Sequence, residues 1–197
     1  MSLKGAITIA ILLFVIGLAV FFLVYPVGLT PSPESTGTRH VVSIAVSSPT
    51  LKPNERIDER YTCEGDDVSP PLKWSGYPAD SKSFVVIMED PDAPGGGFTH
   101  WVVYNIPASV SELPEALPAI DKLDNGIYQG INDFGKIGYG GPCPPPGTTH
   151  RYFFRVYALD TVLELPPGAT KDEVMKGLKD HIIGEGSLMV KYGRQSP

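Results

Sequence analysis

Apolar residues gather in short runs that predict a mainly β domain. The segment 83–90, SFVVIMED, is an almost continuous apolar run, which is typical of a strand covered on both faces. The runs 100–106, HWVVYNI, and 151–160, RYFFRVYALD, predict two more strands. The β-branched segment 40–46, HVVSIAV, predicts the first strand of the domain. In 186–192, GSLMVKY, apolar and polar positions alternate, which predicts a half-buried strand.

One segment near the end of the chain instead has the spacing of an amphipathic helix. Residues 171–183, KDEVMKGLKDHII, place three apolar residues on one stripe: Val174, Leu178 and Ile182. Thr170 and Glu173 form a capping box at its start. Many strands, one late helix and loops that hold most of 21 glycines and 20 prolines indicate a mainly β fold.

The start of the chain has a different character. Residues 6–24, AITIAILLFVIGLAVFFLV, are uncharged and about as long as a helix that crosses a hydrocarbon core. A buried core helix is disfavoured because the run is apolar all round. A cleaved signal peptide is the alternative, although its apolar region is normally shorter and YPVGLTPSPESTG offers no clear cleavage site. We therefore expect an uncleaved transmembrane anchor.

These patterns divide the chain into three parts. Residues 1–25 form the transmembrane anchor or signal segment, 26–39 a linker rich in Pro, Ser, Thr and Gly, and 40–197 the folded domain. Lys4 before the apolar run favours an amino terminus inside the cell, which predicts a single-pass membrane protein with its domain outside the cytoplasm. Secretion after signal cleavage is the alternative.

The net charge of the chain bears on whether it binds nucleic acid. The net charge is −6 at pH 7, and the chain holds no cluster of lysines and arginines. Binding to a nucleic-acid backbone draws on such clusters, so nucleic acid is excluded as a partner.

The two cysteines, Cys63 and Cys143, carry a separate prediction. Neither lies in a CxxC pair and no HExxH motif occurs, so we expect no metal site and no cofactor. An oxidising exterior would allow the two cysteines to form a disulfide. Two small buried thiols are the alternative.

Four polar residues stand at the ends of predicted strands. Asp90 ends one strand and His100 begins the next, and a rigid loop, DPDAPGGGFT, joins them. A second loop rich in proline and glycine leads to His150, which shares strand parity with Tyr152, so both face the same side. Taken singly, an aspartate before proline is usually a turn former and a histidine at a strand end a structural residue. Together the four residues form a candidate binding site.

The motifs that contain these residues resemble one known family. DPDAP with the following His100–Trp101, and GPCPPPGTTHRYFFRVYALD, resemble the phosphatidylethanolamine-binding protein family, also called Raf kinase inhibitor-like proteins, and most of all its bacterial and archaeal branch. TCEGDDVSPPLKW, NDFGKIGYGGP and DHIIGEGSLMVKYGR fit as well, so the resemblance spans roughly residues 40 to 194. It implies a large central β-sheet with a smaller sheet packed on it and few helices.

The resemblance also implies a small pocket for anions such as phosphate, acetate or a phospholipid headgroup. Its residues in this chain would be Asp90, Ala93, Pro94, Phe98, His100, Gly141, Pro144, Pro145, His150 and Tyr152. The chain differs from animal members, which have glycine at the place of Cys143 and a C-terminal helix that adds a tyrosine to the pocket. We therefore expect a more open pocket.

General chemistry agrees with an anion site. Imidazoles donate N–H groups, and Asp90 would orient a histidine and favour its protonation. Backbone N–H groups around Gly140 and Gly141 would form an anion-binding concavity. Asp90 would repel a bare phosphate unless a proton is shared, so we expect modest affinity.

These observations favour a membrane-tethered, extracytoplasmic binding or regulatory domain that is not an enzyme. Its partners would be a small anion or phospholipid headgroup and, as the resemblance implies, a kinase or serine protease that it inhibits. The alternatives are a hydrolytic enzyme that uses Asp90, His100 and His150 for acid–base chemistry, and a scaffold with a vestigial pocket. No nucleophile elbow or phosphate-binding glycine loop supports the enzyme.

Overall fold

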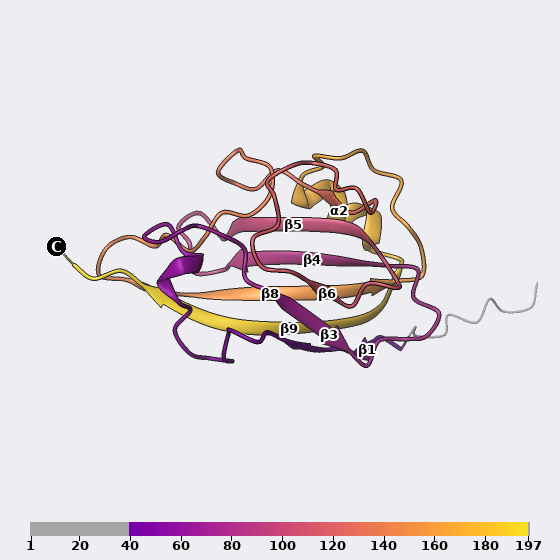
Figure 1. Ribbon diagram of the computed structural model, residues 1–197, viewed down its shortest axis with the longest axis horizontal. Coiled ribbons are helices and arrows are strands. Elements are labelled where there is room, and N and C mark those ends of the chain that lie inside the picture. The colour runs from indigo at the N-terminus through magenta and orange to yellow at the C-terminus, as the bar shows by residue number, and fades with distance from the viewer. Residues whose placement is uncertain (1–39, 197) are drawn as a thin grey trace, which may run out of the picture. The chain divides into compact units, whose positions relative to one another are not determined.

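The computed structural model describes residues 40–196 and contains two β-sheets (Figure 1). The larger has six strands in the order β1-β9-β8-β4-β5-β7, and the smaller has three in the order β2-β3-β6. The strands are β1 (Val42–Ser43), β2 (Ala45–Ser47), β3 (Leu72–Ser75), β4 (Ser83–Asp90), β5 (Phe98–Pro107), β6 (Glu112–Leu113), β7 (Tyr128–Gln129), β8 (Thr149–Leu159) and β9 (Ile182–Gly193). Two helices complete the described part, the 3-10 helix η1 (Glu59–Tyr61) and the α-helix α2 (Lys171–Leu178).

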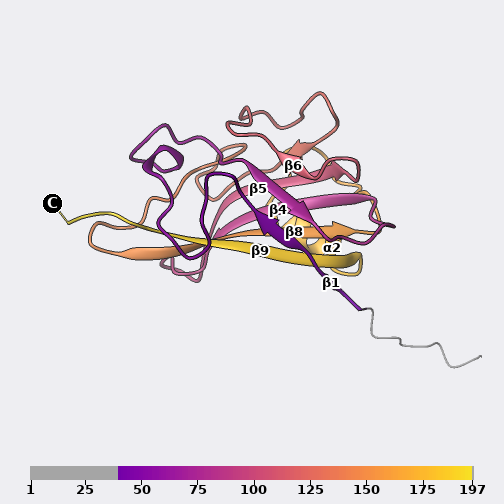
Figure 2. The same cartoon turned by 60° about the horizontal axis from the view of Figure 1, so that its bottom comes forward.

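The long strands form the centre of the larger sheet. β4 lies between β5 and β8 and is antiparallel to both, and β9 is antiparallel to β8 on the other side. The turned view in Figure 2 shows these four strands side by side, with the short β1 beside the beginning of β9. In this order the end of β4 and the beginnings of β5 and β8 meet at one end of the sheet, which is where the candidate site residues stand.

The central strand β4 is covered on both faces, as its apolar run predicts. Phe84 and its even-numbered neighbours pack into a core under the smaller sheet, where Trp74 of β3 meets the Phe84 ring at 5.4 Å. Figure 1 shows β3 crossing in front of the larger sheet. Val85 and Ile87 point to the opposite face and pack into a second core together with α2. Alternating side chains of one strand therefore hold both layers on the sheet.

The prediction of one strand over 40–46 is wrong in one respect. The segment divides into β1, which pairs with β9, and β2, which pairs with β3 of the smaller sheet. Ile44 lies between them, is buried, and donates its N–H to the Glu185 carbonyl at 2.8 Å. Its own carbonyl lies only 2.0 Å from the place of a β-carbon on Gly186, so the crossing requires a glycine there. The β-branched run continues through this crossing and gives no sign of it.

The predicted helix is shorter than its apolar stripe suggests. α2 begins after the Thr170 capping box, as predicted, but ends at Leu178. His181 donates its N–H back to the Leu178 carbonyl, and Ile182 already pairs with Leu159 as the first residue of β9. Ile182 still packs against the core that contains Leu178, as the apolar stripe predicts, but it does so from β9 and not from the helix.

The predicted anchor, residues 6–24, and the predicted linker lie outside the described residues. Within residues 40–196 no helix has the length and apolar character needed to cross a bilayer.

Candidate functional site

A small cavity of about 220 Å³ lies where the end of β4 meets the beginnings of β5 and β8. It brings together eight of the ten predicted site residues. The residues that line it are Asp90, Ala93, Pro94, Phe98, His100, Phe134, Cys143, Pro144, Pro145 and His150. The two predicted residues that do not line it are Gly141 and Tyr152.

A buried aspartate–histidine pair forms one side of the cavity. The Oδ2 atom of Asp90 lies 2.7 Å from Nδ1 of His150, and the two residues are 3% and 7% exposed. The other carboxylate oxygen, Oδ1, accepts the N–H of Asp92 at 2.9 Å. Because a carboxylate accepts from Nδ1–H, the Nε2 atom is the ring nitrogen of His150 that is left for a ligand.

His100 is held in one tautomer by the backbone. Its Nδ1 atom lies 2.6 Å from the carbonyl oxygen of Gly140, which can only accept, so Nδ1 carries the hydrogen. Burial lowers the pKa of His100 below its ordinary value of 6.5, in spite of this bond and of the nearby Asp90 charge. The neutral ring then has a lone pair on Nε2, so His100 provides an acceptor, whereas the sequence predicts a donor.

Tyr152 lies behind this histidine. It is fully buried, and its ring meets the His100 ring edge-on at 5.2 Å between centroids. Its hydroxyl makes no hydrogen bond of ordinary geometry in the described part of the chain, although the Asp90 carboxylate lies near enough to affect its pKa as an acceptor. Burial first, and the Asp90 charge next, raise the pKa of Tyr152 well above its usual range, so the hydroxyl keeps its proton. Tyr152 therefore shapes the back of the site through its ring.

Aromatic rings close another side of the cavity. Phe98 lies 5.1 Å from the His100 ring and 4.6 Å from Phe134, measured between ring centroids. Phe134 is absent from the predicted site although it is 42% exposed and lines the cavity. The only sequence signal for it is its position in NDFGKIGYGGP, a segment that fits the family without revealing which residue reaches the pocket.

Gly141 anchors the neighbouring loop. Its N–H donates to Oδ1 of Asp67 at 2.6 Å, and the N–H of Gly140 donates to the His100 carbonyl at 3.0 Å. Both amides are therefore occupied, and these two residues do not form the predicted anion-binding concavity. A β-carbon on Gly141 would lie 2.4 Å from the Tyr61 carbonyl oxygen, so glycine is required here by close packing.

Asp92 holds the loop between β4 and β5. Its carboxylate accepts from the Arg151 guanidinium in two places, from Nε at 2.9 Å and from Nη2 at 2.6 Å, and from the Arg151 backbone N–H at 2.9 Å. The hydrogen bonds from the Arg151 side chain contribute most to lowering the pKa of Asp92 to about 2. The pair fixes the position of this loop against β8, and with it Ala93 and Pro94.

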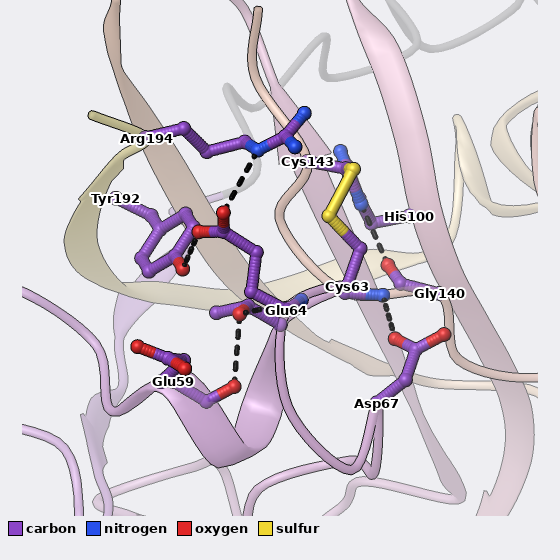
Figure 3. Close-up of a disulfide and its surroundings, with 11 residues drawn as sticks. Glu59, Cys63, Glu64, Asp67, His100, Gly140, Cys143, Tyr192 and Arg194 are labelled. Atoms are coloured by element: carbon purple, nitrogen blue, oxygen red, sulfur yellow. Dashed lines mark hydrogen bonds and ion pairs between the residues drawn. A yellow bond between two sulfur atoms is a disulfide. The ribbon is translucent and has the colours of Figure 1, made fainter. Parts of the chain in front are cut away.

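The structure confirms the predicted disulfide between Cys63 and Cys143, with an S–S distance of 2.08 Å. It joins the segment after η1 to the loop that lines the cavity (Figure 3). Among residues 40–196, no group of three or more histidines, cysteines, aspartates or glutamates is arranged to hold a metal ion.

A wider cleft of about 440 Å³ lies beside the same loop and shares Asp90 and Phe98 with the cavity. Its two cations, Arg155 and Lys171, are both paired with the Glu89 carboxylate. Charges that already neutralise one another attract a charged ligand weakly. We therefore place the candidate site in the smaller cavity.

Comparisons with known proteins identify the family of this chain. A family model of the phosphatidylethanolamine-binding protein matches residues 47–193. The UPF0098 protein of Methanothermobacter thermautotrophicus is 52% identical over 139 residues, which cover 71% of this chain and 91% of the relative. The UPF0098 protein of Pyrococcus horikoshii is 49% identical over 162 residues, covering 81% of each.

Two crystal structures share the fold. The Escherichia coli protein YbcL, described as a new member of the mammalian phosphatidylethanolamine-binding protein family, superposes with a TM-score of 0.72 at 39% identity and covers 76% of this chain and 98% of its own. A phosphatidylethanolamine-binding protein homolog from Chlamydia trachomatis superposes with a TM-score of 0.70 at 38% identity, covering 77% and 98%. From the family match, the identities and the shared fold together, the chain belongs to the phosphatidylethanolamine-binding protein family.

Proposed function

We propose that the domain binds small anions, such as phosphate or the phosphate of a phospholipid headgroup, in the cavity beside Asp90. The observation that carries this proposal is the buried Asp90–His150 pair at a small cavity, in which no hydrogen bond from residues 40–196 occupies Nε2 of His150. When His150 is protonated, this nitrogen becomes a donor for an anion, and Asp90 stabilises the charged ring.

The protonation states of the site favour a ligand that carries its own hydrogen. Neutral His100 supplies a lone pair, which accepts from an O–H group of hydrogen phosphate or of a monoester. His150 supplies the matching donor. The Asp90 charge opposes a doubly charged phosphate, so the proposed site selects the singly charged, protonated form and binds it with modest affinity.

Hydrolysis is the competing function, because an aspartate–histidine pair is also a general base. The residues that line the cavity include no serine, threonine or lysine, and Cys143 is oxidised in the disulfide. A hydroxyl, amine or free thiol nucleophile for covalent catalysis is thus missing from the residues that line the cavity. Turnover of 4-nitrophenyl phosphate or 4-nitrophenyl acetate that disappears in a His150→Ala variant would favour the enzyme over the binding domain.

Affinity for an anion is expected to rise as the pH falls from 8 to 5.5. A protonated His150 ring adds a positive charge and a second N–H donor at the cavity, and both attract the ligand. Acetate is the sharper probe of the charge on the protein, because it stays mostly ionised over this range whereas phosphate changes its own charge. Calorimetric titration of acetate at several pH values measures this directly. Affinity that is constant, or that falls toward low pH, would contradict the role given to His150.

We extend the proposal to the location of the domain, outside the cytoplasm and tethered by the amino-terminal segment. Protease added to intact cells is expected to digest residues 40–197 and leave the segment before them in the membrane. Digestion that requires inverted vesicles would show the opposite orientation.

Inhibition of a kinase or a serine protease, which family membership suggests, would be a further activity of the exposed domain and is tested by adding the purified chain to such enzymes.

A further inference from the structure

One side of the cavity is formed by a segment that makes few hydrogen bonds to the rest of the domain. Cys143, Pro144 and Pro145 line it, and the next residue is also a proline, Pro146. Proline has no backbone N–H, so three consecutive residues of this segment cannot donate a main-chain hydrogen bond. We refer to residues 143–146 as the proline segment.

The segment before it is held firmly without the disulfide. Gly141 donates to Asp67, the Cys63 N–H donates to the Pro142 carbonyl at 3.2 Å, and the Tyr139 hydroxyl donates to the Tyr61 carbonyl at 2.7 Å. These bonds connect both sides of the disulfide up to residue 142. They also hold Gly140, whose carbonyl fixes the His100 ring.

The proline segment itself is held differently. The Pro145 carbonyl accepts from Thr148, a bond inside the same loop, and the next bond to another element is that of the Gly147 N–H to the Arg194 carbonyl at 2.9 Å. Between Pro142 and Gly147, within the described residues, no hydrogen bond joins this segment to the rest of the domain. Among the described residues, the disulfide to Cys63 is therefore the one covalent or hydrogen-bonded link from the proline segment to another element, and packing of the buried Pro144 adds to it.

The disulfide is also open to reagents. Both cysteines are exposed. Arg194 pairs with Glu64, the residue after Cys63, at 3.2 Å. Exposed disulfides are those that exchange with external thiols most readily.

We propose that the Cys63–Cys143 disulfide is a thiol-exchange site that controls the affinity of the anion cavity. The proposal rests on the proposed function of that cavity. An external dithiol attacks one sulfur as a thiolate, forms a mixed disulfide and releases one cysteine thiolate. Its second thiol then attacks the mixed disulfide. The protein gains two electrons and two protons as two thiols, and the dithiol is oxidised to its own disulfide.

Reduction has a localised consequence. The Asp90–His150 pair and the His100–Gly140 bond do not involve the proline segment, so the polar groups of the site remain in place. The proline segment loses its covalent link to Cys63, so that Pro145 and the less exposed Pro144 move away from the cavity for part of the time. If the bound arrangement is populated about one-tenth of the time, the apparent affinity falls about tenfold.

The first test measures amide exchange of the full-length chain before and after reduction with dithiothreitol. The Gly147 and Thr148 amides, which follow the proline segment, are expected to exchange at least about tenfold faster after reduction. The Gly141 amide, bonded to Asp67, is expected to change little. Exchange at Gly147 and Thr148 that is unaffected by reduction would overturn the proposal, whether or not the cavity binds phosphate.

The second test measures phosphate affinity of the oxidised chain, the reduced chain and a Cys63→Ser/Cys143→Ser variant, with circular dichroism to confirm folding. The reduced chain and the variant are expected to bind about tenfold more weakly than the oxidised chain, and reoxidation restores wild-type affinity. Dithiothreitol must not affect the variant. Equal binding by oxidised and reduced chains would overturn the redox control alone, whereas an oxidised chain that binds no phosphate would overturn the proposed function.

Discussion

A His150→Ala variant is expected to bind phosphate at pH 6 about ten to a hundred times more weakly than the wild type, the equivalent of a charged hydrogen bond of about 1.5 to 3 kcal/mol. The variant loses the Nε2 atom, which is the donor that the site presents to an anion. It also leaves Asp90, buried and charged, without its histidine. Both effects oppose binding of a second negative charge next to Asp90. Calorimetric titration with phosphate gives the ratio of dissociation constants.

Two further variants separate the loss of a ligand contact from a loss of folding. His150→Asn keeps a side-chain N–H close to the place of Nδ1, so it retains a donor for Asp90 and removes only Nε2. His181→Ala removes the histidine of a second aspartate pair, with Asp160 at 2.8 Å, outside the cavity and 45% exposed. The Asn variant is expected to lose affinity, and the His181 variant to keep it. A folded His150→Ala protein with wild-type affinity would remove His150 from the site.

Removal of the disulfide is expected to lower the free energy of unfolding by about 4 kcal/mol, because it releases a closed loop in the unfolded chain. The two cysteines are 80 residues apart in sequence, and a loop of this length loses substantial entropy when it is closed. Urea denaturation of the Cys63→Ser/Cys143→Ser variant, compared with the oxidised wild type, measures the difference.

The domain is expected to remain folded without the bridge, because its two apolar cores lie on the faces of the central sheet and do not include either cysteine. The reduced wild type serves as the control, since it lacks the bridge but keeps both cysteines. If the variant and the reduced protein both lose less than about 1 kcal/mol, the bridge does not constrain the unfolded chain as the entropy model requires.

Long strands were predictable from the sequence and short ones were not. β4, β5, β8 and β9 contain eight or more residues each, and their apolar patterns are clear. β6 and β7 contain two residues each, too few to show a period. β3 is short but does carry a pattern. Its buried residues Leu72 and Trp74 alternate with polar residues over four positions.

The sequence motifs were enough to predict most of the residues that line the cavity. Asp90, His100 and His150 meet because an antiparallel order of β8, β4 and β5 places their ends together. The hydrogen-bond partners were not predictable, since the Gly140 carbonyl that fixes His100 and the Asp67 carboxylate that occupies the Gly141 amide come from other loops. The burial that lowers the pKa of His100 likewise depends on the whole fold.

The most direct measurement of the central claim is an NMR titration of the full-length chain, labelled in its histidine rings, with phosphate at pH 6. The chain has four histidines, and two of them, His100 and His150, line the cavity. Their ring signals are expected to shift with phosphate along one saturating curve, while the signals of His40 and His181 remain in place. A titration in which His100 and His150 do not respond, or in which all four shift together without saturation, would contradict an anion site in this cavity.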